Sequence, residues 1–188
     1  EFWVAYPAHI DGTGSVMGIY ITSSKNTSGQ VNAAGNIIPF TITANQVSRV
    51  FLGGAGNPTN TGVYLNMQDG IKSNAAIKIT ADDEVVVYTH IIRSARSGAT
   101  LALPTPVLGI EYIVTNYGSV TGSGSTGDGS QGGISQFAVV ATQSNTVIEI
   151  TPKANGIAGR PAGVPFQITL PNAGDCYQFQ SVQLGDLS

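Results

Sequence analysis

Apolar and polar residues alternate along many short stretches of this chain, which is the pattern of half-buried β-strands. The alternation is clearest in Ala76–Thr80 and Val147–Thr151, whereas Val85–Tyr88 is continuously apolar, as expected for a strand at the centre of a sheet. No segment keeps the helical period of 3.6 residues beyond two turns, and glycine or proline separates nearly all apolar stretches. The predicted strands are Phe2–Tyr6, Val16–Thr22, Ile37–Thr43, Val47–Leu52, Ala76–Thr80, Val85–Ile92, Tyr112–Asn116, Gln136–Thr142, Thr146–Thr151, Val164–Leu170 and Cys176–Gln180.

These strands predict an all-β fold. We expect residues 1–188 to form a single unit, a sandwich of two mainly antiparallel sheets. The only cysteine, Cys176, lies at the start of a predicted strand and is interpreted as a buried free thiol.

The chain also repeats itself. Tyr20–Thr27 resembles Val140–Thr146, and Ile38–Thr43 is echoed by Val164–Thr169. Strands and turns follow in the same order both times, which predicts related β-motifs over residues 15–55 and 135–180. The alternative is that hairpins of similar composition resemble one another by chance.

The segment 118–133 is mostly glycine and serine and has no apolar period, which indicates a flexible loop. Loops of this length are either disordered or functional, and both alternatives stay open. If the loop binds a ligand, Tyr117 at its edge and Asp128 within it are the candidate contacts. Arg93 and Arg96, the closest basic pair in the chain, are two further candidates.

Composition narrows the function classes. Only 10% of the residues are charged and the net charge is −3, so the polar surface is built from Thr, Ser, Asn and Gln, as in many secreted or cell-surface β-proteins. Nucleic acid is an unsuitable partner because phosphate backbones require clustered Lys and Arg. No apolar stretch is long enough to span a bilayer, so membrane insertion is not expected.

Candidate chemistry is sparse. The consecutive acids Asp82, Asp83 and Glu84 could supply a carboxylate pair to a hydrolase, but they read as the turn between two strands. Asp82 and Asp83 are also the best candidates for a calcium site, because carboxylates in loops suit that ion. The sequence has no zinc, phosphate-loop or nucleophile motif, and we expect no catalytic residues and no required cofactor.

Several phrases together resemble the N-terminal domain family of the IgG Fc-binding protein, which also occurs in large secreted bacterial surface proteins. They are Glu1–Tyr6, Ile77–Tyr88, Leu101–Pro104 with Leu108–Tyr112, Ala138–Ile150 and Gly185–Ser188. The resemblance covers nearly the whole chain and implies extracellular binding or adhesion, without catalytic residues to carry over. Family members usually continue past the closing Asp-Leu-Ser motif, so we expect this chain to be part of a longer protein.

The leading hypothesis is a non-catalytic adhesion or recognition module, secreted or on a cell surface, that binds a glycan or glycoprotein. The alternatives are a structural spacer in a large surface protein and, third, a hydrolase using Asp82, Asp83 and Glu84. Clustered exposed aromatic residues would favour recognition, a uniform Thr/Ser/Asn surface would favour the spacer, and a deep acidic cleft would favour the enzyme.

Overall fold

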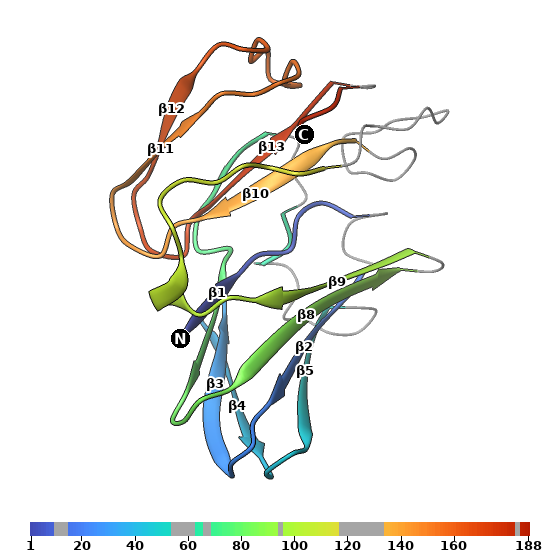
Figure 1. Cartoon of the computed structure of the whole chain (residues 1–188), viewed down its shortest axis with the longest axis vertical. Coiled ribbons are helices and arrows are strands. Elements are labelled where there is room, and N and C mark those ends of the chain that lie inside the picture. Colours follow the sequence, from blue (N-terminus) through green and yellow to red (C-terminus); the bar gives the residue numbers. More distant parts are fainter. Residues whose placement is uncertain (10–14, 54–62, 66–68, 94–95, 117–133, 183–184) are drawn as a thin grey trace.

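The computed structural model describes residues 1–9, 15–53, 63–65, 69–93, 96–116, 134–182 and 185–188. Within them the predicted all-β fold class is confirmed: the strands pair antiparallel, and the one helical element is a 3₁₀ turn, η3 (Thr105–Val107) (Figure 1). The strands are β1 (Phe2–Val4), β2 (Val16–Thr22), β3 (Thr27–Ala33), β4 (Asn36–Ile42), β5 (Val47–Gly53), β6 (Gly70–Lys72), β7 (Ile77–Ala81), β8 (Val86–Arg93), β9 (Arg96–Ala102), β10 (Gln136–Val140), β11 (Thr146–Ile150), β12 (Phe166–Leu170) and β13 (Cys176–Gln180).

The first nine strands, apart from β6, form a sandwich. One sheet has the order β1-β7-β3-β4 and the other β5-β2-β8-β9, and the two pack face to face in the lower half of Figure 1. Alternate residues of each strand point into the shared core, so that Met17, Ile19 and Ile21 of β2 are fully buried. The apolar residues that recur at every second position of the sequence are thus the residues that form this core.

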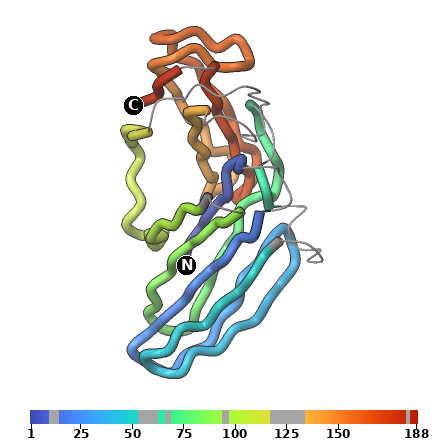
Figure 2. The backbone as a smooth tube through the Cα atoms, turned by 90° about the vertical axis from the view of Figure 1, so that its right-hand side faces the viewer, coloured from blue at the N-terminus to red at the C-terminus, as the bar shows by residue number. Residues whose placement is uncertain are grey.

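The remaining strands form a second pair of sheets, with the orders β10-β13-β6 and β11-β12. Their core is aromatic. The ring of Phe179, which has no exposed surface, stacks against Phe137 and Phe166 at centroid distances of 5.4 and 6.1 Å. This part lies in the upper half of Figure 1, and Figure 2 shows the same arrangement after a quarter turn.

β13 connects the two parts because it is covered on both faces. One face lies in the aromatic core, and the other packs with Leu65, Ala75 and Ala76 against Trp3 and Ala5. All five residues of β13 are therefore buried. The Cys176 side chain is among them, which confirms the predicted buried thiol, and its burial raises the pKa of that thiol to about 12.

The two segments that resemble each other in sequence also share a pairing pattern. In residues 15–55 the outer strands β2 and β5 pair in one sheet and the inner strands β3 and β4 pair in the facing sheet. In residues 135–180, β10 pairs with β13 and β11 with β12 in the same way. This shared pairing is what an internal duplication would produce.

A matching turn precedes the last strand of each segment. Asn45 and Gly174 both adopt positive φ, at 62° and 92°. Each backbone N–H donates a 2.8 Å hydrogen bond to a carbonyl just past the first strand, at Ser23 and Ala141 respectively. Asparagine and glycine are the residues that tolerate this left-handed conformation best.

Some elements differ from the sequence prediction. The apolar pattern misses β3, β6 and β9, which are polar, very short or built from small residues. The predicted strand Tyr112–Asn116 is wrong, because these residues join no ladder. Tyr112 and Ile113 are instead 68% and 89% exposed. A β-prone sequence forms a strand only where a neighbouring strand can pair with it. The predicted flexible loop at 118–133 lies outside the described residues.

Candidate functional site

The outward side of sheet β5-β2-β8-β9 carries a cluster of rings, and we call this side the aromatic face. Tyr20 of β2 lies opposite Tyr88 of β8. Two residues earlier on β2, Gly18 is flanked by Phe51 of β5 and His90 of β8. The ring of Tyr20 meets Phe51 and His90 edge-on, at centroid distances of 6.1 and 6.2 Å. Three strands therefore contribute to one continuous ring cluster.

The aromatic face is unusually apolar for a surface. Phe51 and Tyr88 are each 47% exposed, and aliphatic side chains surround the rings. An antiparallel sheet with one buried face normally presents polar residues on the other. The aliphatic neighbours, all at least 39% exposed, are Val47, Val86, Ile92 and Leu101.

Gly18 allows the rings to gather. A Cβ atom at this position would lie 2.9 Å from a ring carbon of Tyr20 and 3.4 Å from one of Phe51, so any side chain would push them apart. On the opposite side of the sheet, the buried Tyr6 hydroxyl donates a 2.8 Å hydrogen bond to the Gly18 carbonyl. Burial raises the pKa of Tyr6, so this phenol stays a donor. This hydrogen bond from the core side thus fixes the backbone of β2 at the centre of the aromatic face.

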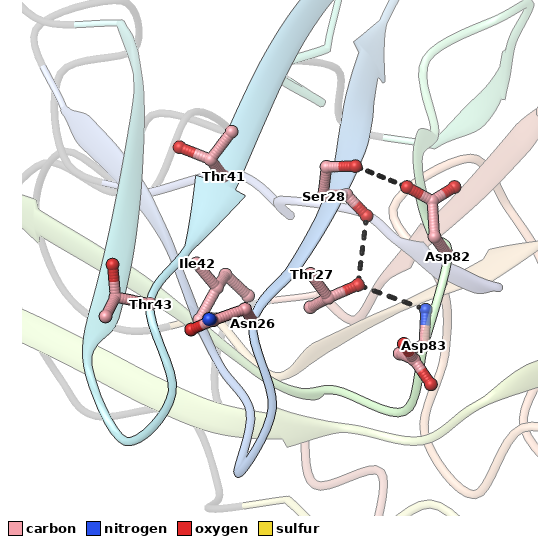
Figure 3. A pocket seen from close by; sticks show the side chains of 8 residues that line it. All are labelled: Asn26, Thr27, Ser28, Thr41, Ile42, Thr43, Asp82 and Asp83. Atoms are coloured by element: carbon pink, nitrogen blue, oxygen red, sulfur yellow. Dashed lines mark hydrogen bonds between the residues drawn. The ribbon is translucent and has the colours of Figure 1, made fainter.

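A polar groove lies at the end of the other sheet. Its lining is mostly hydroxyl, amide and carboxylate groups (Figure 3). It continues past Thr41 and Thr43 into a second open hollow between β4 and β5, lined by Arg49 and Phe51, so it reaches the rim of the aromatic face. The lining residues are Asn26, Thr27, Ser28, Thr41, Ile42, Thr43, Asp82 and Asp83.

The carboxylates of this groove are engaged separately. The Ser28 hydroxyl donates to Asp82, whereas Asp83 forms a 3.1 Å ion pair with Lys25, and the two carboxylates diverge in Figure 3. Asp82, Asp83 and Glu84 are exposed on the turn between β7 and β8. No group of three or more His, Cys, Asp or Glu that could hold a metal occurs within the described residues.

Calcium binding at Asp82 and Asp83 can be tested by thermal denaturation. Because Lys25 already neutralises Asp83, we expect the melting temperature to be the same in millimolar calcium and in chelator. A rise of several degrees in calcium, abolished by Asp82→Asn but not by Asp69→Asn, would instead assign this groove as a calcium site.

The other predicted contacts are dispersed. Arg93 is half-buried at the end of β8 and pairs through its backbone with Arg96 at the start of β9. This pair lies at the opposite end of β8 from Asp82 and Asp83. Tyr117 and Asp128 are outside the described residues.

Sequence reasoning missed Tyr20, Phe51, Tyr88 and His90. A usable signal was present, because Ile19 and Ile21 point inward and the two-residue period then directs Tyr20 outward.

A second polar cluster lies beside the aromatic core. The Tyr177 hydroxyl donates a 2.7 Å hydrogen bond to Asp69 Oδ1, while the buried Asp69 Oδ2 has no hydrogen-bond partner among the residues that the structure describes. Burial raises the pKa of Asp69 above its ordinary value of 3.8, and it also raises the pKa of Tyr177. The folded chain therefore disfavours the ionised Asp69 carboxylate.

Replacing Asp69 with Asn should stabilise the protein at neutral pH. The unfolded chain releases the Asp69 proton at lower pH than the folded chain, so wild-type stability falls as pH rises from 3.8 through the raised folded pKa. A neutral amide escapes that loss, so we expect Asp69→Asn to be more stable than the wild type at pH 7 but not at pH 3.5. Urea denaturation at pH 3.5 and 7 measures this difference. Equal destabilisation by Asp69→Asn at both pH values would contradict the prediction.

Comparison with known proteins gives one match. Residues 98–188 match the family described as IgGFc binding protein. Neither the curated proteins nor the solved structures contain a match to this chain. The matched range covers β10 to β13 and reaches into β9, so of the residues on the aromatic face it includes Leu101 and Ala99. No helix in the described part of the chain is long and apolar enough to span a bilayer. Residues 98–188, just under half of the chain, are thus similar to the IgGFc binding protein family, the family that the resemblance in the sequence implied.

Proposed function

We propose that this chain is an extracellular recognition module that binds the glycan of a glycoprotein on its aromatic face. The observation that carries the proposal is the half-exposed ring cluster of Tyr20, Phe51, Tyr88 and His90 on an otherwise regular sheet. Exposed apolar patches of this kind mark interaction sites in soluble proteins. The family match supports a binding role.

The size of the aromatic face favours a sugar over a protein surface. Three strand spacings of about 4.8 Å and six residue steps of about 3.4 Å give a face of roughly 14 by 20 Å. That is roughly 300 Å², well below the roughly 800 Å² that each partner buries in a stable protein complex. A short oligosaccharide fits such an area.

The chemistry of the face also suits a sugar. The C–H side of a pyranose ring stacks on aromatic rings, while its hydroxyls need hydrogen-bond partners nearby. The Tyr88 hydroxyl, His90 and Arg49, which lies opposite Tyr20 in the ladder, offer such partners on the same side of the sheet. The polar groove at the rim could accept further sugar units through its Thr and Ser hydroxyls.

A structural spacer is the second candidate. The low charge and the Thr/Ser-rich outer strands are compatible with it, but a spacer gains nothing from an exposed ring cluster, which carries an aggregation risk. A hydrolase acting through Asp82, Asp83 and Glu84 finds little support, because these residues are exposed on one turn and do not face each other across a cleft.

A glycan array probed with the labelled 188-residue chain tests the proposal, with IgG Fc spotted in glycosylated and deglycosylated form. We expect saturable binding to a defined sugar class. Binding to Fc that survives deglycosylation would replace the glycan with a protein epitope. A blank array in both calcium and chelator would reject glycan recognition and leave the spacer role.

A further inference from the structure

The described part of the aromatic face carries one Lys or Arg residue, Arg49. Arg49 of β5 lies directly opposite Tyr20 of β2, so the two side chains leave the same side of the sheet with their Cβ atoms about 5 Å apart. Phe51 follows two residues later on the same strand and therefore points the same way. The arginine is thus the immediate neighbour of two rings of the face.

The guanidinium of Arg49 has no counter-charge within the described part of the chain. It is exposed and takes part in no ion pair, hydrogen bond or cation–π contact there, whereas Lys25, Lys78 and Arg160 each contact a carboxylate or a ring. The strands of the aromatic face, and the neighbouring β4, contain no Asp or Glu. An anion bound on the rings would therefore meet the donors of the guanidinium and no repelling carboxylate of these strands.

A hollow beside Arg49 offers further polar partners. It runs between β4 and β5, and Thr41, Thr43 and Gln46 line it together with Arg49 and Phe51. A pyranose that stacks its C–H side on the rings directs its equatorial substituents along the surface of the sheet. At the β5 edge these substituents reach the guanidinium and the hydroxyl and amide groups of the hollow.

We propose that the aromatic face selects a sugar with a carboxylate on its ring, a sialic or uronic acid, and that Arg49 determines this selection. The inference rests on the proposed glycan function and names its ligand class. The sugar ring stacks on Tyr20 and Phe51, while its carboxylate accepts two hydrogen bonds from the guanidinium. The planar donor fork of arginine matches a carboxylate in geometry and in charge.

The charges nearby restrict the ligand to one acidic unit. A polyanion requires clustered Lys and Arg, and the described aromatic face offers Arg49 alone. The polar groove that continues from the hollow contains two carboxylates: Asp83 is paired with Lys25, but Asp82 accepts its hydrogen bond from the neutral Ser28. A second acidic unit would be repelled there. The acidic sugar is therefore the end unit at Arg49, and the units that follow along the groove are neutral.

Matched pairs of glycans test this inference. The probes are sialyllactose and a trisaccharide that ends in glucuronic acid, each beside the same compound with its carboxylate converted to the methyl ester. We expect the 188-residue chain to bind at least one of the two acids about fivefold or more tightly than its ester, the upper end of what a well-aligned exposed ion pair contributes. Calorimetric titration measures both dissociation constants.

Two variants assign the preference to Arg49. Arg49→Gln should remove the preference for the acid over the ester, and it should leave the melting temperature unchanged because the side chain is exposed. Lys153→Gln is the matched control, since it removes the same charge from the exposed segment that follows β11. This variant should keep the full preference for the acid.

Several results would overturn the inference. Equal binding of acid and ester, or a preference that survives Arg49→Gln, would reject the role of Arg49 and leave glycan recognition in place. Tighter binding of a sulfated sugar or of heparin, with an affinity that falls steeply as salt rises, would replace the single carboxylate with another anion. Binding to none of these probes and to no sugar on the array would reject the inference together with the proposed function.

Discussion

Replacing Tyr88 with Ser is expected to weaken glycan binding about tenfold or more without unfolding the protein. Tyr88 lies near the centre of the aromatic face and is 47% exposed, so its ring is available to a ligand and contributes little to the core. Removing a central aromatic side chain from a binding surface typically costs 1–2 kcal/mol or more, and 1.4 kcal/mol is about a factor of ten in the dissociation constant. Titration of the best array ligand, followed by calorimetry, measures this factor.

Tyr112→Ser is the matched control. Tyr112 is also an exposed tyrosine, but it lies on the extended segment after η3 rather than on the aromatic face. Its loss should leave the dissociation constant within about twofold of wild type, which is within the usual neutrality of distant surface changes. Weakened binding by Tyr112→Ser with none by Tyr88→Ser would move the site away from the sheet. Because few charges surround the rings, the wild-type affinity should also change little with salt.

Phe179→Ala is expected to cost about 3–5 kcal/mol of unfolding free energy, the usual range for removing a buried phenylalanine. The ring is fully buried between Phe137 and Phe166, and it also fills the space over Gly156, where a Cβ would lie 2.7 Å from it. Neighbouring side chains relax only partly into such a cavity, which adds to the cost. Urea denaturation followed by tryptophan fluorescence measures the loss, since Trp3 packs against the neighbouring core.

Phe51→Ala provides the comparison for the same substitution at the surface. Phe51 is about half exposed, so its removal should cost no more than about 1 kcal/mol. A similar cost at both positions would mean that Phe179 does not occupy a packed core. Phe51→Ala should instead weaken glycan binding. We thus expect Phe179→Ala to lower mainly the stability of the protein and Phe51→Ala to lower mainly its affinity for the glycan.

Much of this architecture is predictable from the period of the sequence. The strongly alternating stretches became β7 and β11. The likeness of two distant segments in sequence has a counterpart in their shared strand pairing. Strands such as β3 and β9 escape prediction because Thr, Ser, Gly and Ala form strands mainly when neighbours impose the conformation. Tyr112–Asn116 shows the converse, since β-prone residues there have no adjacent strand.

The candidate site was less accessible to sequence reasoning. Asp82 and Asp83 could be assigned to a turn, but whether their carboxylates converge depends on Ser28 and Lys25, which approach from another strand and loop. The aromatic face depends on the register of β2 between β5 and β8, which brings Tyr20, Phe51 and His90 together from three distant stretches. A single sequence does not specify that register. The sequence period predicts that Tyr20 points outward, but it does not predict which residues of β5 and β8 lie beside it.

The pairing of β6 with a strand of the second part has a consequence for dividing the protein into fragments. β6 precedes β7 in the chain, yet it pairs with β13 rather than with any strand of the first sandwich. If the chain were cleaved once between residues 116 and 134, the two fragments would therefore stay associated through the β6–β13 ladder. Expressed alone, the N-terminal fragment would contain β6 without its partner β13, and the C-terminal fragment would lack the edge strand of the sheet β10-β13-β6. We therefore expect the two parts to fold together as one unit.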